Sequence, residues 1–313
     1  MAVNGKATSF MDMKTQPKKV QYYTSFGDRV YMLIVYIILW ASLVVVAVPL
    51  IFVLASSFSS AEAIAAGRVF LWPVEFNIRG YKLIFKTSAI MIGYRNSIFY
   101  TLAGTAINIV MTILAAYPLS RKDFQARSFV TVLLSITMFF NGGLIPTYLL
   151  IRNLGMLDTI WAMLIPTALG VWNVIITRTY IQSNIPDDLY ESASLEGCGD
   201  FYYLIKIVIP LSRPIIAVMA LLYAVGHWNS YFNAMIYLSS RELFPLQLIL
   251  RDILILNMGL GNPQDVERQQ ELLYFSYLLR YSTIVVASLP VMLAYPFVQK
   301  HFIKGIMIGA LKG

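Results

Sequence analysis

The sequence predicts an all-α integral membrane protein with six spanning helices. Hydrophobic residues make up 58% of the 313 residues and charged residues only 13%, with a mean hydropathy of +0.67. An ordinary soluble domain carries about 25% charged residues, so a soluble core could not absorb this many apolar side chains. Backbone groups in lipid must be hydrogen-bonded internally, and the sequence lacks the roughly ten-residue alternation of a membrane β-barrel, which leaves helices.

Six apolar segments each approach the roughly 20 residues that a helix needs to cross a bilayer. The first follows a polar segment, residues 1–29, and is too long for the apolar part of a cleaved signal peptide, so we expect a retained anchor. The membrane domain is expected to occupy residues 30–313. The six segments are residues 30–55, 95–119, 128–151, 159–180, 214–238 and 280–299.

Lysine positions predict the orientation of these helices, because basic residues are enriched in cytoplasmic loops. With the N-terminus inside, nine of the eleven lysines fall in the cytoplasm. Both termini and the loop 184–212 are therefore expected inside, and the loops 56–94 and 239–279 outside. The inner lysines are Lys6, Lys14, Lys18, Lys19, Lys122, Lys206, Lys300, Lys304 and Lys312, and the outer ones are Lys82 and Lys86.

The polar loop 184–212 is expected to fold into two short helices outside the bilayer. Pro186 suits the first turn of a helix that continues over residues 187–197. Gly197 and Gly199 are expected to stop this helix, because glycine adopts the left-handed C-cap conformation at little cost. The loop should therefore turn sharply after the first helix.

Asp200 is expected to cap the second helix, and Pro210 and Pro214 are expected to end it. Ala193 and Gly197 are small enough to let another surface come close to the turn. The apolar positions of the second helix recur at i, i+3, i+4 and i+7, which predicts a single face. These positions are Phe201, Leu204, Ile205 and Val208.

The spacing of residues in this loop matches a known pattern. Glu191-Ser192-Ala193 is followed by Gly197 six positions after the glutamate, by Ile207 at sixteen and by Pro210 at nineteen. This register resembles the cytoplasmic signature loop of the permease subunits of binding-protein-dependent ABC importers. Ser192, Glu196, Cys198 and Ile209 are mild departures, and the serine and the cysteine keep the small size that the pattern has at their positions. The resemblance implies that these loop residues couple to a separate ATPase: Glu191, Ser192, Ala193, Glu196, Gly197, Ile207 and Pro210.

Shorter matches extend the resemblance over residues 90–313. The stretches Ala116–Arg121, Trp228-Asn229 and 304–313 look like the carbohydrate branch of this family, which contains the maltose-type permeases. Residues 140–148 and 227–234 resemble the LplC-like polysaccharide and oligosaccharide permeases more closely. The resemblance implies a type I ABC importer permease fold with a cytoplasmic coupling helix.

The same resemblance implies a division of labour between several chains in a bacterial cytoplasmic membrane. A second, homologous permease would complete the path for an oligosaccharide or polysaccharide fragment. Two ATP-binding subunits would dock on the signature loops, and an extracytoplasmic sugar-binding protein would deliver the sugar. ATP and Mg²⁺ would be held by the ATPase subunits, with no cofactor on this chain.

The sequence offers no candidate catalytic site. It has two histidines, scattered carboxylates without metal-ligand spacing, and no nucleophile elbow or triad pattern. It lacks a Walker A loop, so ATP must be bound elsewhere. The net charge of +8 fits contact with anionic lipid headgroups, and no basic patch with interleaved aromatic residues predicts a nucleic-acid partner. The chain is therefore expected to be a transport subunit and not an enzyme.

Polar and aromatic residues within the spans are candidates for the sugar path, because unpartnered polar groups are costly in lipid. Aromatic faces suit sugar C–H groups and amides suit hydroxyls. Asn229 and Asn233, like His227 and Tyr231, are four residues apart and are expected to share faces of one helix. Helix packing through interhelical hydrogen bonds would place the same residues, so both interpretations stay open. The candidates are Asn141, Trp172, Asn173, His227, Trp228, Asn229, Tyr231 and Asn233.

Other transport classes are weighed against this interpretation. A secondary transporter should carry ion-coupling carboxylates in its helices, yet none of the six segments contains Asp or Glu. A membrane enzyme would need clustered catalytic residues, and the acidic cluster in the loop 184–212 lacks histidine. An importer permease for a non-sugar solute, or a passive scaffold, stays possible from the sequence.

Overall fold

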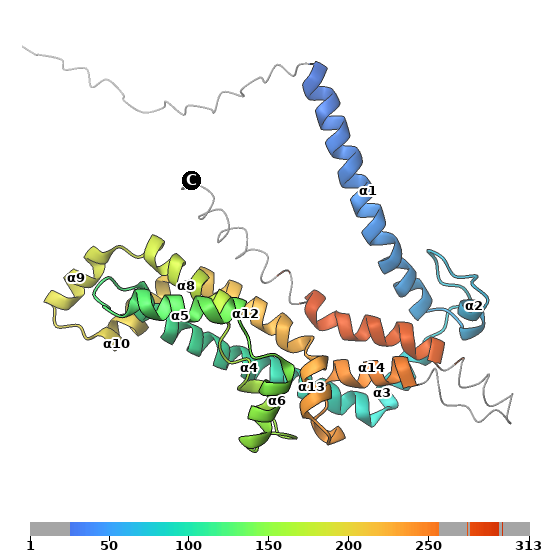
Figure 1. The fold of residues 1–313 in the computed structure, drawn as a ribbon. Coiled ribbons are helices and arrows are strands. Elements are labelled where there is room, and N and C mark those ends of the chain that lie inside the picture. The colour runs from blue at the N-terminus through green and yellow to red at the C-terminus, as the bar shows by residue number, and fades with distance from the viewer. Residues whose placement is uncertain (1–25, 257–273, 275, 294–295, 297–313) are drawn as a thin grey trace, which may run out of the picture. The chain divides into compact units, whose positions relative to one another are not determined.

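The computed structural model describes residues 26–256, 274, 276–293 and 296. Regular structure in these residues is entirely helical (Figure 1). The chain divides into two units, residues 1–50 and 51–313, and each is described by itself. In the first unit, residues 26–50 form the greater part of α1 (Phe26–Ser57), a 32-residue helix that is long and apolar enough to cross a bilayer.

The second unit contains the remaining helices. The segment from α10 to α11 is one continuous helical stretch with a π-helical centre, η1. The elements are α2 (Ala61–Ala65), α3 (Arg79–Lys86), α4 (Ser88–Ser120), α5 (Arg127–Phe139), α6 (Leu144–Asn153), α7 (Trp161–Leu164), α8 (Val171–Asn184), α9 (Asp187–Leu195), α10 (Asp200–Tyr203), η1 (Leu204–Val208), α11 (Ile209–Leu211), α12 (Arg213–Trp228), α13 (Tyr231–Tyr237), the 3₁₀ helix η2 (Arg241–Leu243), α14 (Leu246–Leu256) and a helix over Ser276–Leu293.

Three described helices are long and apolar enough to span a membrane without a break: α1, α4 and the Ser276–Leu293 helix. Two bent pairs of helices raise the number to five if each pair counts as one span.

The expected segment 128–151 is α5 and α6, which meet at 113°. The chain turns there through Gly142-Gly143, and Gly143 has a φ of +81°. The expected segment 159–180 is broken between α7 and α8, where Pro166 and Gly170 lie. The last expected segment runs beyond the described residues.

The expected fifth span, 214–238, is also not one straight helix. α12 ends at Trp228 and α13 begins at Tyr231, with Asn229 and Ser230 between them. At its other end α12 bends by 80° away from the α10–α11 stretch. The expectation that His227 and Tyr231, or Asn229 and Asn233, share one helical face is therefore wrong.

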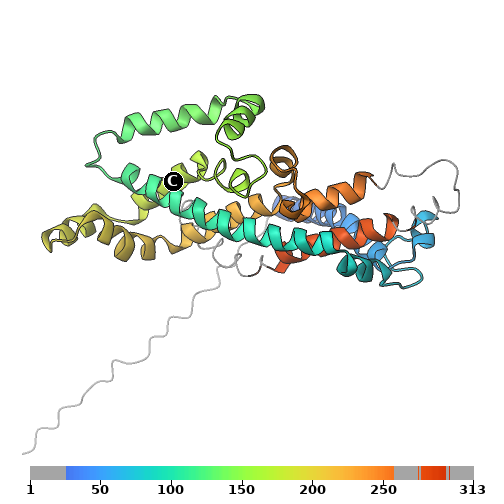
Figure 2. The ribbon, with the colours of Figure 1, turned by 90° about the horizontal axis from the view of Figure 1, so that it is seen from below.

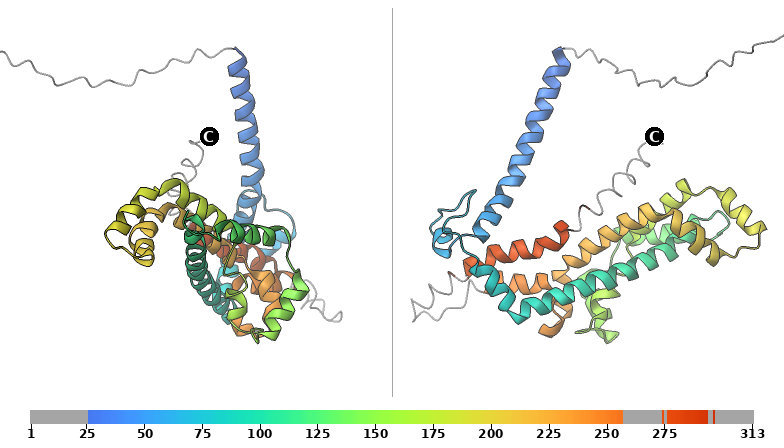
Figure 3. Two further views of the ribbon diagram at one scale, coloured as in Figure 1. Left: turned by 60° about the vertical axis from the view of Figure 1, so that its left-hand side comes forward. Right: turned by 180° about the vertical axis from the view of Figure 1, so that it is seen from behind.

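α4 is the helix around which the second unit packs. It lies along α12 and also contacts α8 and α14 (Figure 3). Figure 2 shows α5 at the edge of this packing, and α5 has no buried residue. A stripe of small and polar residues recurs every four positions on the buried face of α4. Its members are Asn96, Tyr100, Gly104, Asn108, Thr112 and Ala116.

The stripe fixes the connection between α13 and α14 by hydrogen bonds to backbone carbonyls. Asn96 Nδ2 donates to the carbonyl oxygens of Glu242 (2.6 Å) and Phe244 (3.0 Å). The Tyr100 hydroxyl donates to the carbonyl oxygen of Leu243 (2.9 Å). Small and polar residues are typical of helix contacts in membranes, where close approach and hydrogen bonds replace the hydrophobic drive of water.

Candidate coupling loop and transport cavity

The first helix of the loop forms as expected. α9 begins after Pro186, whose backbone is extended with ψ at 144°, and ends at Leu195. The Cys198 N–H donates to the Ala193 carbonyl and the Gly197 N–H to the Ser194 carbonyl, both at 2.9 Å. This pair of bonds is a Schellman cap, which requires the left-handed conformation that Gly197 adopts with a φ of +79°. The turn predicted at Gly197 is therefore confirmed.

The second helix departs from the expectation in its capping and in its apolar face. Gly199 is the N-cap of α10, and the Asp200 carboxylate instead accepts a hydrogen bond from the Tyr190 hydroxyl at 2.9 Å. Pro210 lies inside the helical stretch and does not end it. The reason lies in η1, where the Ile209 N–H reaches back five residues to the Leu204 carbonyl. This wider turn fits a chain whose Pro210 lacks an N–H.

The π-helical turn also changes which side chains are buried. Leu204 and Val208 are buried together with Tyr203, whereas Phe201 is 70% exposed and Ile205 is 42% exposed. The prediction of one apolar face through all four positions was therefore wrong for Phe201 and Ile205. The segment from α9 to α11 forms a hairpin. Phe201 and Ile205 add apolar area to the exposed surface of this hairpin.

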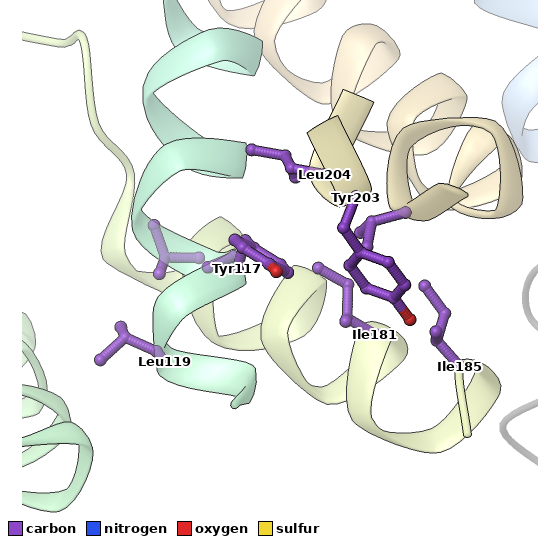
Figure 4. Packing of buried hydrophobic residues seen from close by; sticks show 9 residues of the cluster. Tyr117, Leu119, Ile181, Ile185, Tyr203 and Leu204 are labelled. Atoms are coloured by element: carbon purple, nitrogen blue, oxygen red, sulfur yellow. The ribbon is translucent and has the colours of Figure 1, made fainter. Parts of the chain in front are cut away.

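The hairpin is fixed to the ends of α4 and α8 by a buried cluster (Figure 4). Tyr203 and Leu204 from the hairpin pack against Tyr117 and Leu119 of α4 and Ile181 of α8. Ala193, Cys198 and Ile207 pack against the same cluster. Because protein interiors are densely packed, a displacement of the hairpin would be passed to both helices.

A polar clamp, which we define as Arg121, Asp123, Tyr190 and Asp200, joins the end of α4 to the hairpin. The Arg121 guanidinium lies 3.2 Å from the centre of the Tyr190 ring. It also donates two hydrogen bonds to the Asp123 carboxylate, at 3.1 and 3.0 Å. These bonds from Arg121 lower the pKa of Asp123, and the bond to Asp200 raises the pKa of Tyr190. The clamp therefore holds α9 in place from outside the buried cluster.

The residues expected to contact an ATPase divide into an exposed and a packed set. Glu191, Ser192, Glu196 and Gly197 are exposed, which leaves them free for a partner. Ala193, Ile207 and Pro210 are half-buried. The hairpin thus presents a polar edge while its other side is anchored in the chain.

Three of the sugar-path candidates belong to segments other than α12 and α13. Asn141 is exposed, and its Oδ1 accepts a hydrogen bond from the Gly143 N–H at 3.0 Å, within the bend between α5 and α6. Trp172 is 60% exposed and Asn173 is half-buried, both in the first turn of α8. Asn233 is half-buried on α13.

His227 and Trp228 are buried and have partners within the chain. His227 Nε2 lies 2.6 Å from Asn108 Oδ1, and the Asn108 amide donates to the Thr167 carbonyl at 2.5 Å. The Trp228 indole N–H donates to the Ala287 carbonyl at 3.2 Å. His227 therefore helps to pack α12 against α4. This role matches the helix-packing interpretation that the sequence left open beside the sugar path.

Trp228 also contributes, with Asn229 and Tyr231, to a cavity of about 580 Å³. The break between α12 and α13 places these residues beside α14 and the Ser276–Leu293 helix, which supply the other walls. Sequence reasoning did not name Gln247, Arg251 or Thr283. The first two fall in a segment interpreted as an outer loop, although Leu246, Ile249, Leu250 and Ile253 recur there at the helical spacing i, i+3, i+4 and i+7. The wall residues are Trp228, Asn229, Tyr231, Gln247, Leu250, Arg251, Thr283, Ile284, Ala287, Ser288, Val291 and Met292.

Comparison with known proteins identifies the family. No family model matches the chain. A crystal structure of a bacterial ABC transporter involved in import of the acidic polysaccharide alginate contains a chain that is similar, with a TM-score of 0.82 and 32% identity. The match covers 90% of this chain and 99% of that one.

Curated relatives agree with this structural likeness. The chain is 38% identical over 295 residues to the polygalacturonan/rhamnogalacturonan transport system permease protein YtcP of Bacillus subtilis (strain 168), covering 91% of this chain and 99% of YtcP. The chain belongs to the carbohydrate ABC transporter permeases. Protein LplC of the same organism is also 38% identical, over 265 residues that cover 85% of this permease and 89% of LplC.

Membership in this family accounts for the apolar surface of the permease. Phe129, Val132 and Phe139 of α5 are 68%, 57% and 81% exposed, which a soluble protein would avoid on one helix. As a membrane protein, the permease can present such side chains to lipid tails or to another membrane helix. The described residues contain no group of three or more His, Cys, Asp or Glu side chains that could hold a metal ion.

Proposed function

We propose that the permease is one of two membrane subunits of an ATP-driven oligosaccharide importer in the bacterial cytoplasmic membrane. A second, homologous permease would complete the translocation path, and two ATP-binding subunits would hold ATP and Mg²⁺. An extracytoplasmic binding protein would deliver the sugar. In this arrangement both termini and the hairpin of α9 to α11 face the cytoplasm.

The observation that carries this proposal is the way the hairpin is built. Its exposed edge carries Glu191 and Gly197, while Tyr203 and Leu204 are buried against α4 and α8. A partner bound to the exposed edge would therefore move both helices when it moves. Chemical steps would occur on the ATPase, and this permease would convert their displacement into a change of access to the path.

An oligosaccharide is the proposed cargo because of the cavity walls as well as the relatives. Trp228 and Tyr231 offer aromatic faces, and Asn229 and Gln247 offer amides, next to a space of about 580 Å³. This volume lies within the range of roughly 300–1,000 Å³ that is usual for small-molecule sites. Among the relatives named above, YtcP is a permease of a polygalacturonan/rhamnogalacturonan transport system, and the similar crystal structure is of a transporter involved in alginate import.

Replacing Glu191 tests the coupling role. In the complete importer reconstituted in vesicles, Glu191→Ala should lower both sugar uptake and sugar-stimulated ATP hydrolysis, while the permease still assembles in the membrane. Glu62→Ala is the matched control, because Glu62 is also an exposed glutamate and lies on α2, outside the hairpin. Unchanged activity in Glu191→Ala, or an equal loss in both variants, would contradict the proposal.

A further inference from the structure

Three segments of the chain line the cavity beside α13. Gln247, Leu250 and Arg251 lie at i, i+3 and i+4 on α14. Thr283 and Ser288, with the apolar residues between them, come from the Ser276–Leu293 helix. The third wall is the break at Asn229, flanked by Trp228 and Tyr231. The cavity is therefore built from elements that are distant in the sequence, and Trp228 ties two of them together through its bond to the Ala287 carbonyl.

Arg251 is the single charged residue among the described residues that line this cavity. Its one ion pair within the described chain is with the adjacent Asp252, at 3.5 Å, and the two side chains are 38% and 32% exposed. A guanidinium has five N–H donors, so most of them stay available to a ligand. A cation next to apolar side chains costs free energy unless an anion or hydrogen-bond acceptors offset the lost hydration.

Thr283 supplies a second observation at the same cavity. The residue is 2% exposed, and its hydroxyl has no hydrogen-bond partner among the described residues. Buried hydroxyls normally find a partner, because leaving one without costs about 1–3 kcal/mol. Thr283 lines the same cavity as Arg251, and its hydroxyl, which is itself buried, becomes available to a polar group in the cavity when the Thr283 side chain rotates.

We propose that this cavity binds a carboxylate-bearing sugar unit, a uronate, of the transported oligosaccharide. Arg251 meets the planar carboxylate, the geometry for which a guanidinium fork is best suited. Thr283, Asn229 and Gln247 face the sugar hydroxyls, and Trp228 and Tyr231 cover the C–H face of the ring. The inference rests on the proposed import function and adds to it a substrate class and a residue that selects it.

The test measures direct binding to the assembled importer in nanodiscs, without the binding protein, so that only the membrane subunits decide the outcome. The probes are trigalacturonate and its fully methyl-esterified form, which have the same length and differ in the carboxylate charges. The wild-type complex should bind the acid at least tenfold more tightly than the ester. Arg251→Gln should abolish this difference, and Arg251→Lys should restore part of it.

Two controls isolate the cavity. Arg241→Gln removes an exposed arginine of η2 that does not line the cavity, and it should keep the preference for the acid. Thr283→Val, which removes the hydroxyl at nearly constant volume, should weaken binding of both probes to a similar extent. Equal affinity of the wild type for acid and ester, or an unchanged preference in Arg251→Gln, would overturn the inference.

An anionic lipid headgroup carries a charge comparable to that of the sugar carboxylate and could occupy the same cavity. The lipid composition of the nanodisc distinguishes these two ligands. Binding of the acid should persist in discs of phosphatidylcholine alone and should fall little when phosphatidylglycerol is added. Absence of sugar binding in both kinds of disc would overturn the inference. Uptake by the complete wild-type importer is measured in parallel: uptake without a preference for acids contradicts only this inference, whereas absence of any oligosaccharide uptake contradicts the proposed function.

Discussion

Replacing Gly197 tests the effect of backbone strain without a steric clash. Its φ is +79°, and a Cβ atom added there would meet nothing within 4 Å. Gly197→Ala should therefore destabilise the hairpin by about 1–2 kcal/mol through the left-handed conformation alone. The expected result is a drop in sugar-stimulated ATP hydrolysis by the reconstituted importer, with basal hydrolysis retained.

Gly199 provides the control, two residues away. It is equally open, but its φ of −74° suits any L-residue, so Gly199→Ala should leave the stimulated rate near that of the wild type. Gly197→Asn should be milder than Gly197→Ala, because asparagine tolerates the left-handed region. Similar losses for alanine at both positions would show that open space at the turn, and not its backbone conformation, matters for coupling.

Gly104 illustrates the opposite constraint, in which the space and not the backbone is limiting. A Cβ atom at Gly104 would overlap the ring of His227. Gly104→Ala should therefore push that ring away from Asn108 and destabilise the assembled complex by about 1–3 kcal/mol. Thermal unfolding of the purified complex measures this loss.

The control for Gly104 lies on the facing helix. Gly226→Ala meets no atom within 4 Å, and alanine favours helix formation, so this variant should be neutral or slightly stabilising. The preference among sugars should be the same in both variants, because His227 is engaged in packing. A changed preference in Gly104→Ala without a loss of stability would contradict this role.

These two glycines show which residue roles the sequence can reveal. The role of Gly197 was predictable, since its cap involves residues only a few positions away. The role of Gly104 was not, because it depends on His227, which is far away in the sequence. The same limit applies to Arg251 and Thr283, which line one cavity only when α14 and the Ser276–Leu293 helix pack together.

At the scale of the element, the polar clamp should set how rigidly α9 follows α4. Arg121→Gln removes the cation from the Tyr190 ring, and because the Arg121 side chain is only 15% exposed, this contact is worth about 1–2 kcal/mol. The stimulated ATPase rate should fall about five- to thirtyfold, since that free energy corresponds to this factor in an equilibrium. Tyr190→Phe should have a smaller effect, because it keeps the ring and loses only the bond to Asp200.

Lys122→Ala is the matched control for the clamp. Lys122 is the neighbour of Arg121, and its ion pair with Asp187 (2.7 Å) also joins the end of α4 to α9. The two side chains are 77% and 46% exposed, and such surface pairs contribute little. The stimulated rate should stay within twofold of the wild type. A larger loss in Lys122→Ala than in Arg121→Gln would show that the clamp is not the main attachment.

Elements were predictable where local signals and tertiary packing agree. α9 follows from Pro186 and Gly197, and α4 from its apolar length. The break at Asn229 could not be read from an apolar run, which carries no sign of the bond that the adjacent Trp228 makes to the Ser276–Leu293 helix. The π-helical turn before Pro210 was missed for a related reason, since a periodicity of 3.6 was assumed throughout.

At the scale of the whole molecule, composition sufficed to predict a helical membrane protein, and the spacing from Glu191 to Pro210 sufficed to predict the family. The number of straight helices was harder to predict. Length and hydropathy treat residues 128–151 as one span, whereas the structure bends there by 113°. Irregular backbone at such breaks needs protein partners or a wet cavity in place of lipid.

The orientation of the molecule stays a prediction that two exposed lysines can test. Lys82 lies on α3 and Lys206 lies in η1, on segments that the lysine distribution assigns to opposite sides of the membrane. On a Cys198→Ser background, which removes the single native thiol, Lys82→Cys should react with an impermeant thiol reagent added to intact cells. Lys206→Cys should react only after the membrane is permeabilised. Labelling of Lys206→Cys in intact cells would place the hairpin outside, where no ATP-binding subunit could reach it, and would contradict both the topology and the coupling role.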